Sequence, residues 1–306
     1  MRQGQTIFLT GASGFIGGTL AIQLMANGYR VRGLVRSADK AAQLTALGIE
    51  AVMGDLDDLA LLSTEAKNAD AVINTASADH AASVDAMLQA LEDSHKLFIH
   101  TSGSSIVGDD VRGSSKSEVI FDESTPLQVH ELKQSRRNID LSVLNAASRG
   151  VQSVVICPSL IYGVGKGLHT TSVQIPFLVS NAIQHGVVQI VGQGKNTWSN
   201  VHIDDVVDLY VLALNKAPAG AFYFAANGEA SFLELAQAIT HRLQFSKVEH
   251  LMPELAAAQW GVGMAYFSLG SNSRVRSVRA KTELNWMPRH SSVLEWISTE
   301  MPILKH

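Results

Sequence analysis

The chain has 306 residues, a hydrophobic fraction of 46% and a formal net charge of −4. This weakly acidic balance gives no reason to expect nucleic acid or an anionic membrane as a partner. No apolar run reaches the ~18 residues of a membrane span, and the N-terminus lacks the charged-then-apolar pattern of a leader. The single cysteine, Cys157, cannot form an intramolecular disulfide. We therefore expect a cytoplasmic protein with one large domain, or one domain and a smaller lobe.

The stretch Thr6 to Gly18, TIFLTGASGFIGG, predicts a buried strand, a glycine turn and an apolar helix that begins at Phe15. Gly11 lets the chain reverse, Gly14 leaves room for a pyrophosphate, and Gly17 lets the helix lie close to the sheet. The free amides of the first helical turn then face the phosphate oxygens. The pattern predicts a dinucleotide site, and an ordinary glycine-rich turn is the alternative.

The stretch from Arg30 to Arg36 is predicted as the second strand and ends in a basic residue. In dinucleotide-binding sheets, an acidic residue about 20 positions beyond the glycines binds the ribose of NAD, whereas an arginine accommodates the 2′-phosphate of NADP. Counted from Gly17, this position is Arg36, and no Asp or Glu occurs in the first 38 residues. We predict NADP(H), with NAD(H) as the alternative, and expect help from Arg32 or Lys40. A solvated basic strand end is the other role that Arg36 allows.

Strands and helices continue to alternate along the first half of the chain. The expected strands include 49–53, 70–75, 97–100 and 151–157, and the expected helices include 38–47, 81–91 and 130–149. The polar stretch 109–129 is expected to be a long loop. This order predicts an α/β fold, a doubly wound parallel Rossmann sheet with a smaller C-terminal α/β substrate lobe. We place an NAD(P)-binding domain at 1–165 and the substrate-binding lobe, interleaved with it, at 166–306.

The TGASGFIG sequence of residues 10–17 resembles the cofactor turn of the short-chain dehydrogenase/reductase superfamily. Its Phe-Ile pair resembles the extended branch, which includes nucleotide-sugar epimerases, dehydratases and dihydroflavonol-type reductases. Further similarities occur at Gly54-Asp55-Leu56, at PSLIYG of residues 158–163, at VHIDDV of residues 201–206 and at LNWMP of residues 284–288. The resemblance runs nearly from end to end, with its sharpest motifs in the first 165 residues.

The resemblance implies that the cofactor lies along the glycine turn and the strand ends that follow it. The expected cofactor-binding residues are Gly11, Ser13, Gly14, Phe15, Ile16, Gly17, Arg36, Lys40, Asp55, Leu56, Thr75, Ala76, Ser77, Thr101, Arg136, Pro158 and Leu160. Asp55 is expected to accept a hydrogen bond from the adenine amino group and Leu56 to cover the ring. The other role expected for Asp55 is to cap the following helix, and the two roles are compatible.

The superfamily's proton-transfer residues are not all present. Its members carry a serine or threonine after the fifth strand and Tyr-x-x-x-Lys on the next helix, which places both side chains on one helical face. None of the five tyrosines lies between Gly103 and Ile161. The tyrosine and lysine positions fall on Leu132 and Arg136 or, in another register, on Val129 and Lys133. Gly103 stands where the serine is usual.

The proton donor therefore has to be sought among other residues. We name Ser102, Ser104 and Tyr162 as candidate catalytic residues, the serines either directly or through a water that they hold. His130 and His202 are chemically able, although each also has a helix-start or strand-end position that suits a structural role. Arg136 stays protonated, so it can hold a phosphate or a ribose but is a poor acid. Tyr162 occupies a position that is usually structural in the superfamily.

Trp198, His202 and Arg274 are the candidate substrate-binding residues, with interlobe packing as the alternative. Asp204 and Asp205 are expected to cap a helix rather than to take part in catalysis. The eleven histidines show no metal-ligand spacing, so no metal site is expected.

The leading functional prediction is an NADP(H)-dependent oxidoreductase that acts on a small carbonyl or alcohol substrate in the cleft between the Rossmann domain and the C-terminal lobe. The alternatives are a nucleotide-sugar epimerase or dehydratase, and a non-catalytic regulator that senses NADP(H). A homodimer is suggested only by analogy with the superfamily.

Overall fold

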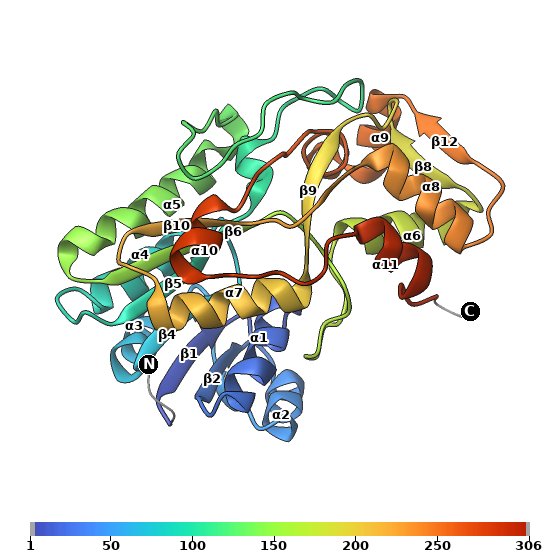
Figure 1. Ribbon diagram of the computed structural model, residues 1–306. Helices are drawn as coiled ribbons and strands as arrows, with labels where there is room; N and C mark the ends of the chain where they lie inside the picture. The colour runs from blue at the N-terminus through green and yellow to red at the C-terminus, as the bar shows by residue number, and fades with distance from the viewer. Residues whose placement is uncertain (1–3, 304–306) are drawn as a thin grey trace.

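The chain forms a seven-stranded parallel sheet covered by helices on both faces, and a smaller lobe beside it (Figure 1). The computed structural model describes residues 4–303. The strand order is β10-β6-β5-β4-β1-β2-β3. These strands are β1 (Thr6–Thr10), β2 (Arg30–Val35), β3 (Glu50–Met53), β4 (Ala71–Asn74), β5 (Leu97–Thr101), β6 (Gln152–Pro158) and β10 (Ala221–Ala225).

Apolar side chains on the two faces of the sheet explain the two helical layers. One core lies between the sheet and helices α1 (Phe15–Ala26), α2 (Ala38–Ala46), α7 (Ile203–Lys216) and α10 (Val278–Leu284). The other core lies between the sheet and helices α3 (Leu59–Asn68), α4 (Ala81–Ala90) and α5 (Gln134–Asn145). A sheet buried on both faces needs nearly continuous apolar strands, and the short runs read from the sequence have this character. The predicted doubly wound α/β fold is confirmed.

The strand order reverses between β1 and β4, which are neighbours in the sheet. Their following loops therefore diverge and leave a crevice at the carboxyl ends of the strands, where such sheets bind ligands. The glycine turn after β1 and Thr75 after β4 lie at this crevice.

The smaller lobe lies beside the large sheet (Figure 1). It has its own core, formed by residues from 160 onward. Strand β8 (Val188–Val191) pairs with β12 (Val248–Leu251), and β9 (Thr197–His202) lies between β7 (Leu160–Tyr162) and β11 (Glu229–Ser231). The lobe's helical segments are α6 (Gln174–His185), α8 (Phe232–Arg242), α9 (Pro253–Trp260), a π-helical turn (Gly263–Ser268) and α11 (Val293–Thr299). Because β10 returns to the large sheet, the two parts alternate along the chain; the boundary placed at residue 165 stays a prediction.

The single long helix expected over 130–149 was wrong in detail. The segment is a 3₁₀ turn at Glu131–Lys133, then α5, then a second 3₁₀ turn at Ala146–Arg149. A third 3₁₀ turn, Ser104–Val107, follows β5. The expected loop at 109–129 contains no helix or strand, and its one isolated bridge joins Phe121 to Val275. None of the helices within residues 4–303 has both the length and the apolar character required to cross a bilayer.

Candidate cofactor and substrate cleft

The glycine turn is packed so tightly that two of its glycines have no room for a side chain. Gly11 has φ +78°, and a Cβ placed on it would lie 2.6 Å from the Thr75 hydroxyl oxygen. A Cβ on Gly17 would lie 2.2 Å from the carbonyl oxygen of Gly11. A Cβ on Gly14 would meet only that same carbonyl oxygen, at 3.2 Å. Gly11 and Gly17 are thus required by the turn itself, whereas Gly14 keeps the approach to the turn open.

Gly14 is also the N-cap residue of α1, and it supplies no side-chain oxygen to the first helical turn. An α-helix leaves its first backbone amides without intrahelical partners. The amides at the start of α1 therefore remain available to an anion beside the turn, where the helix dipole favours negative charge.

A cavity of about 700 Å³ lies beside this turn. It brings together ten of the residues expected to bind the cofactor, which come from the ends of four strands and from α2. They are Gly11, Ser13, Gly14, Arg36, Lys40, Asp55, Leu56, Thr75, Ala76 and Ser77.

The basic residues at the end of β2 have different surroundings. Arg36 and Lys40 are exposed, line the cavity and form no ion pair with any described residue. Arg32, which was expected to assist them, instead bridges Glu50 at 2.9 Å and Glu65 at 2.7 Å. The positive charge available at this end of the cavity therefore comes from Arg36 and Lys40.

Asp55 does not cap the following helix, so that alternative was wrong. One of its carboxylate oxygens accepts hydrogen bonds from the backbone amides of Asp57 and Asp58. The N-cap of α3 is Asp58, whose side chain accepts from the Leu61 amide. The second carboxylate oxygen of Asp55 is left for a ligand at the cavity wall.

A second cavity, of about 560 Å³, adjoins the first, because Gly14, Thr75 and His169 line both. The two cavities form one continuous cleft over the carboxyl ends of the strands. Besides Gly14 and Thr75, seven further predicted residues line its second half, and they are Phe15, Ile16, Ser102, Ser104, Arg136, Pro158 and Trp198.

A segment that the sequence analysis did not assign to the site covers part of the cleft. The Lys166 amide donates to the Thr19 hydroxyl at 3.0 Å, and Gly167 lies against Gly18 of α1. This contact holds the stretch 168–173 and the first residue of α6 beside the turn, where His169, Thr171, Ser172, Val173 and Gln174 line the second cavity. No motif in this stretch indicated from the sequence that it would enter the cleft.

Arg136 lies at the second half of the cleft but its charge is already paired. Its guanidinium makes two hydrogen bonds to the Asp79 carboxylate, at 2.8 and 2.5 Å, and another to the Ser105 hydroxyl at 2.9 Å. The hydrogen bond from Arg136 lowers the pKa of Asp79. A Cβ at Gly103 would lie 3.3 Å from this guanidinium, so the missing serine leaves the space that Arg136 occupies.

Lys133, named in the sequence only as an alternative register, also lines the second cavity. Its ammonium lies 5.5 Å from the centre of the Phe267 ring. Burial, and then the nearby Arg136, lower the pKa of Lys133. No carboxylate among the described residues lines this cavity, so Lys133 leaves it positively charged.

Several predicted residues are buried away from the cleft, or line it with a side chain that is already bonded. Thr101 is buried and bonded to the Tyr210 hydroxyl at 2.6 Å, and Leu160 is buried in β7. Ser104 lines the cleft, but its hydroxyl lies 2.8 Å from that of Ser273. Tyr162 is 1% exposed, and burial raises the pKa of its phenol. Among the described residues, no tyrosine lines either cavity.

His202 supports the fold behind the cleft. Its ring accepts a hydrogen bond from the Asp204 amide and so caps α7, which corrects the prediction that Asp204 and Asp205 are the caps. It stacks on His290 with ring centroids 3.8 Å apart, and burial, with His290, lowers the pKa of His202 to about 4. The Asp205 carboxylate accepts from the backbone amides of Arg289 and His290 instead.

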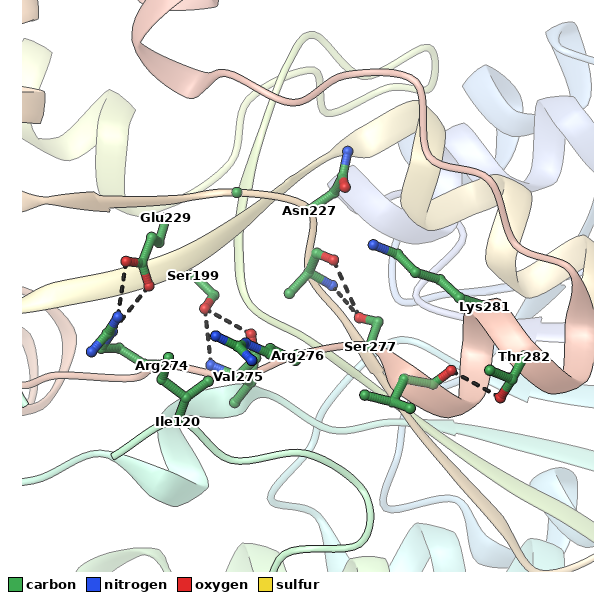
Figure 2. Close-up of a pocket in the computed structure, with 13 residues that line it drawn as sticks. Ile120, Ser199, Asn227, Glu229, Arg274, Val275, Arg276, Ser277, Lys281 and Thr282 are labelled. Atoms are coloured by element: carbon green, nitrogen blue, oxygen red, sulfur yellow. Dashed lines mark hydrogen bonds and ion pairs between the residues drawn. The ribbon is translucent and has the colours of Figure 1, made fainter. Parts of the chain in front are cut away.

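Arg274 lines a different cavity of about 530 Å³, shown in Figure 2. Its guanidinium forms two hydrogen bonds with Glu229, at 3.0 and 2.9 Å. Ser199 lines this cavity whereas its neighbour Trp198 lines the cleft, because successive strand residues point to opposite faces. Trp198 therefore reaches the predicted site, and Arg274 lies on the other side of β9.

The parallel sheet, its glycine turn and the cleft over the strand ends define a Rossmann-fold protein of the dinucleotide-binding class. The model of the NAD dependent epimerase/dehydratase family matches residues 7–224. The chain belongs to this family, as the resemblance to the extended short-chain dehydrogenases/reductases implied.

The relatives carry names of several oxidoreductases. The chain is 35% identical over 326 residues to oxidase ucsJ of Acremonium sp., and the alignment covers 92% of each protein. It is 27% identical over 237 residues, 72% of this chain and 68% of the relative, to the 4-hydroxy-2-methyl-3-oxo-4-farnesyl-3,4-dihydroquinoline-1-oxide ketoreductase of Stigmatella aurantiaca.

A solved structure agrees with the fold. The dTDP-glucose 4,6-dehydratase of Bacillus anthracis in complex with NAD superimposes with a TM-score of 0.77 at 18% identity, over 97% of this chain and 95% of that one. Together with the family, the named relatives identify an NAD(P)-dependent enzyme of the oxidoreductase or epimerase type.

Proposed function

We propose that the protein is an NADP(H)-dependent oxidoreductase that interconverts a small carbonyl compound and its alcohol in the cleft. The observation that carries the choice of cofactor is the pair Arg36 and Lys40, which line the first cavity and have no ion-pair partner in the part of the chain that the structure describes. A 2′-phosphate there would gain charge-assisted hydrogen bonds, and no carboxylate at the end of β2 replaces them for NAD.

The residues of the first cavity suit the rest of the dinucleotide. The amides at the start of α1 would hold the pyrophosphate, and the side chains of Asp55 and Leu56 would hold the adenine. The nicotinamide would reach the second cavity, beside Phe15 and Pro158. When bound, the cofactor supplies the hydride, and the protein supplies orientation and charge.

The second cavity favours a small substrate that carries negative charge or a polarised oxygen. Its lining includes Lys133 and Arg136 but no carboxylate among the described residues. Because Arg136 is paired with Asp79, the ammonium of Lys133 is the charge left for the substrate. The ketoreductase among the relatives supports carbonyl reduction as the direction of the reaction.

The family and the lining of the cleft also give some support to two other functions. Nucleotide-sugar epimerisation or dehydration has support from the family, but no tyrosine of the described chain lines the cleft to exchange the proton. The same feature supports a non-catalytic regulator that binds NADP(H). Turnover separates the enzymes from the regulator, and dependence on a nucleotide sugar separates the two enzymes.

The test is calorimetric titration of the protein with NADPH and NADH, followed by the absorbance of the reduced nicotinamide with a panel of carbonyl compounds, acids among them. We expect tighter binding of NADPH and its consumption with at least one carbonyl. Tight binding without consumption across the panel would favour the regulator. Failure to bind either cofactor would overturn the assignment of the cleft.

A further inference from the structure

A chain of polar side chains runs from the cleft into the core between α5 and the sheet. It begins at Ser102, which lines the second cavity and donates to the Asp140 carboxylate at 3.0 Å. The other carboxylate oxygen of Asp140 lies 3.9 Å from Nε2 of His100 on β5. The side chains of Asp140 and His100 are both 0% exposed, and these two facing atoms have no hydrogen-bond partner among residues 4–303.

Neighbouring side chains determine which nitrogen of His100 carries its proton. The Asn74 amide oxygen accepts from the Thr10 hydroxyl at 2.5 Å and from the Ala76 amide at 3.3 Å. The Asn74 amide nitrogen is therefore the donor toward Nδ1 of His100, 3.0 Å away. Nδ1 is then the acceptor of the neutral ring, so its proton sits on Nε2 and faces Asp140.

The titratable and charged groups around Asp140 lie on α5, on the loop after β4, on β5 and on β6. Arg136 and Arg137 lie on its own helix, Asp79 on the loop after β4, and His100 on β5. Arg137 approaches the carboxylate to 3.8 Å, while Arg136 is paired with Asp79.

The thiol of Cys157, on β6, is buried beside the same group, and its pKa is raised by burial. Burial also raises the pKa of Asp140 to about 6 and lowers the pKa of His100 to about 4. Between these values Asp140 holds a proton and His100 is neutral.

A purely structural carboxylate in the core would be expected to have all its hydrogen-bonding atoms satisfied, because unsatisfied buried polar atoms are costly. Here an acceptor of Asp140 and a donor of His100 face each other without a bond. The only hydrogen bond of the Asp140 carboxylate among the described residues comes from Ser102, the one member of the chain that reaches the cleft. This arrangement suits a group that exchanges a proton with the cleft.

We propose that Ser102, Asp140 and His100 form a proton relay, which supplies the proton that a tyrosine provides in the resembled superfamily. The proposal rests on the proposed function, because it concerns the acid for carbonyl reduction. Ser102 is the catalytic residue, since it lines the second cavity, where its hydroxyl would meet the substrate oxygen. Asp140 and His100 are positioning residues that act through it.

In the reducing direction, the carbonyl carbon gains the hydride of the reduced nicotinamide, and the carbonyl oxygen takes the proton of the Ser102 hydroxyl. When Asp140 is protonated, its proton lies on the oxygen that faces Ser102, so this hydrogen bond then runs from Asp140 to Ser102, the reverse of its direction with the carboxylate. Ser102 takes this proton, and Asp140 is left as a carboxylate facing the Nε2 proton of His100. After the alcohol leaves, water in the open cleft returns one proton to Asp140 through Ser102. Overall, one carbonyl compound, one reduced cofactor and one proton are converted into one alcohol and one oxidised cofactor.

The decisive variant is Asp140→Asn, which keeps the size of the side chain and an acceptor for Ser102 but has no carboxylic proton. We expect turnover to fall about 100-fold, as is typical when general acid catalysis is lost. The wild-type rate should fall as pH rises through about 6, and this dependence should be absent from the variant. Asp140→Glu should restore part of the turnover and part of its pH dependence. The matched control is Asp85→Asn, the same substitution at an exposed position of the neighbouring helix α4. Its turnover and pH dependence should equal those of the wild-type protein.

Infrared spectroscopy of the cofactor-free protein gives a readout that does not depend on turnover. The wild-type protein at pH 5 should show the carbonyl band of a buried carboxylic acid, which disappears at pH 8 and is absent from Asp140→Asn. A band that is unchanged in this variant would overturn the relay, as would wild-type turnover and pH dependence in the variant. Loss of the same pH dependence in Lys133→Met, but not in Asp140→Asn, would make Lys133 the acid instead. Absence of turnover in the wild-type protein itself would instead defeat the proposed function.

Discussion

The two ends of the cleft are built in different ways. The end beside the glycine turn consists largely of short segments that each follow a strand, and the sequence predicted ten of the seventeen described residues that line it. The substrate end combines residues from the turn, from β5, α5 and β6, from the crossing stretch 168–174, from β9 and from the π-helical turn near residue 267. The comparison shows that a local motif can be read from a sequence, whereas a surface shared by many distant segments requires the packed structure.

The largest effect should come from breaking the turn itself. A Cβ on Gly17 would lie 2.2 Å from the backbone carbonyl of Gly11, which cannot rotate away. We expect Gly17→Ala to destabilise the protein by about 3 kcal/mol, as overpacking of a rigid site does, and to abolish binding of both cofactors. Gly14→Ala is the control, since its Cβ has room: the fold should remain while both cofactors bind more weakly. Thermal unfolding and calorimetry measure the two effects, and a wild-type Tm in Gly17→Ala would contradict this account of the turn.

The next effect concerns the buried pair at the substrate end. Because the folded pKa of Asp140 is raised to about 6, its contribution to stability is present below its unfolded value and is lost as pH rises through about 6. His100, whose pKa is lowered to about 4, contributes stability above its unfolded value and loses it as pH falls through about 4. Between pH about 4 and about 6, the stability contributed by Asp140 falls as pH rises, whereas the stability contributed by His100 grows.

Asp140→Asn removes the first contribution and leaves the second. Relative to the wild-type protein, its free energy of unfolding should therefore rise by about 3 kcal/mol as pH rises from about 4 to 6.5, since one pKa unit is worth about 1.4 kcal/mol. Urea unfolding across this range measures the difference. Identical pH dependence in the two proteins would show that Asp140 has an ordinary pKa.

The third effect tests the cofactor end. Arg36→Ala should weaken NADPH binding about 10- to 100-fold, the value of a charge-assisted hydrogen bond, and should leave NADH nearly unchanged. Arg30→Ala is a suitable control, because Arg30 is exposed at the opposite end of β2. Calorimetric Kd values give the comparison. Equal losses for the two cofactors would remove the 2′-phosphate assignment.

The smallest effect is expected from Lys133→Met, which keeps the length of the side chain and removes its charge. The KM of an acidic carbonyl substrate should rise about tenfold, as for one charged hydrogen bond, while the Kd of NADPH stays the same. A neutral substrate of similar size serves as the control and should be affected less. If the substitution weakened only the binding of NADPH, Lys133 would belong to the cofactor end of the cleft.

The resemblance to the superfamily also had a limit that these residues make clear. It placed the glycine turn and the strand ends correctly, but it supplied no replacement for the missing tyrosine. Tyr162 and His202, named for their chemistry, have side chains buried behind the cleft. Asp140 lies one helical turn beyond Arg136, and nothing in the sequence distinguishes it from the acidic residues that are usually exposed on helices. Only its 0% exposure and the facing His100 distinguish it.

The sheet, the glycine turn and the basic end of β2 can be predicted from the sequence, because each depends on residues close together in the chain and on the fixed geometry of strand, turn and helix. Only the folded protein shows that Arg32 is paired with Glu50 and Glu65, that Arg274 is paired with Glu229, and that no carboxylate of residues 4–303 lines the cavity beside Lys133. Charge pairing and burial depend on which segments meet in space. A side chain's protonation and availability therefore follow from its neighbours in the folded protein rather than from its neighbours in the chain.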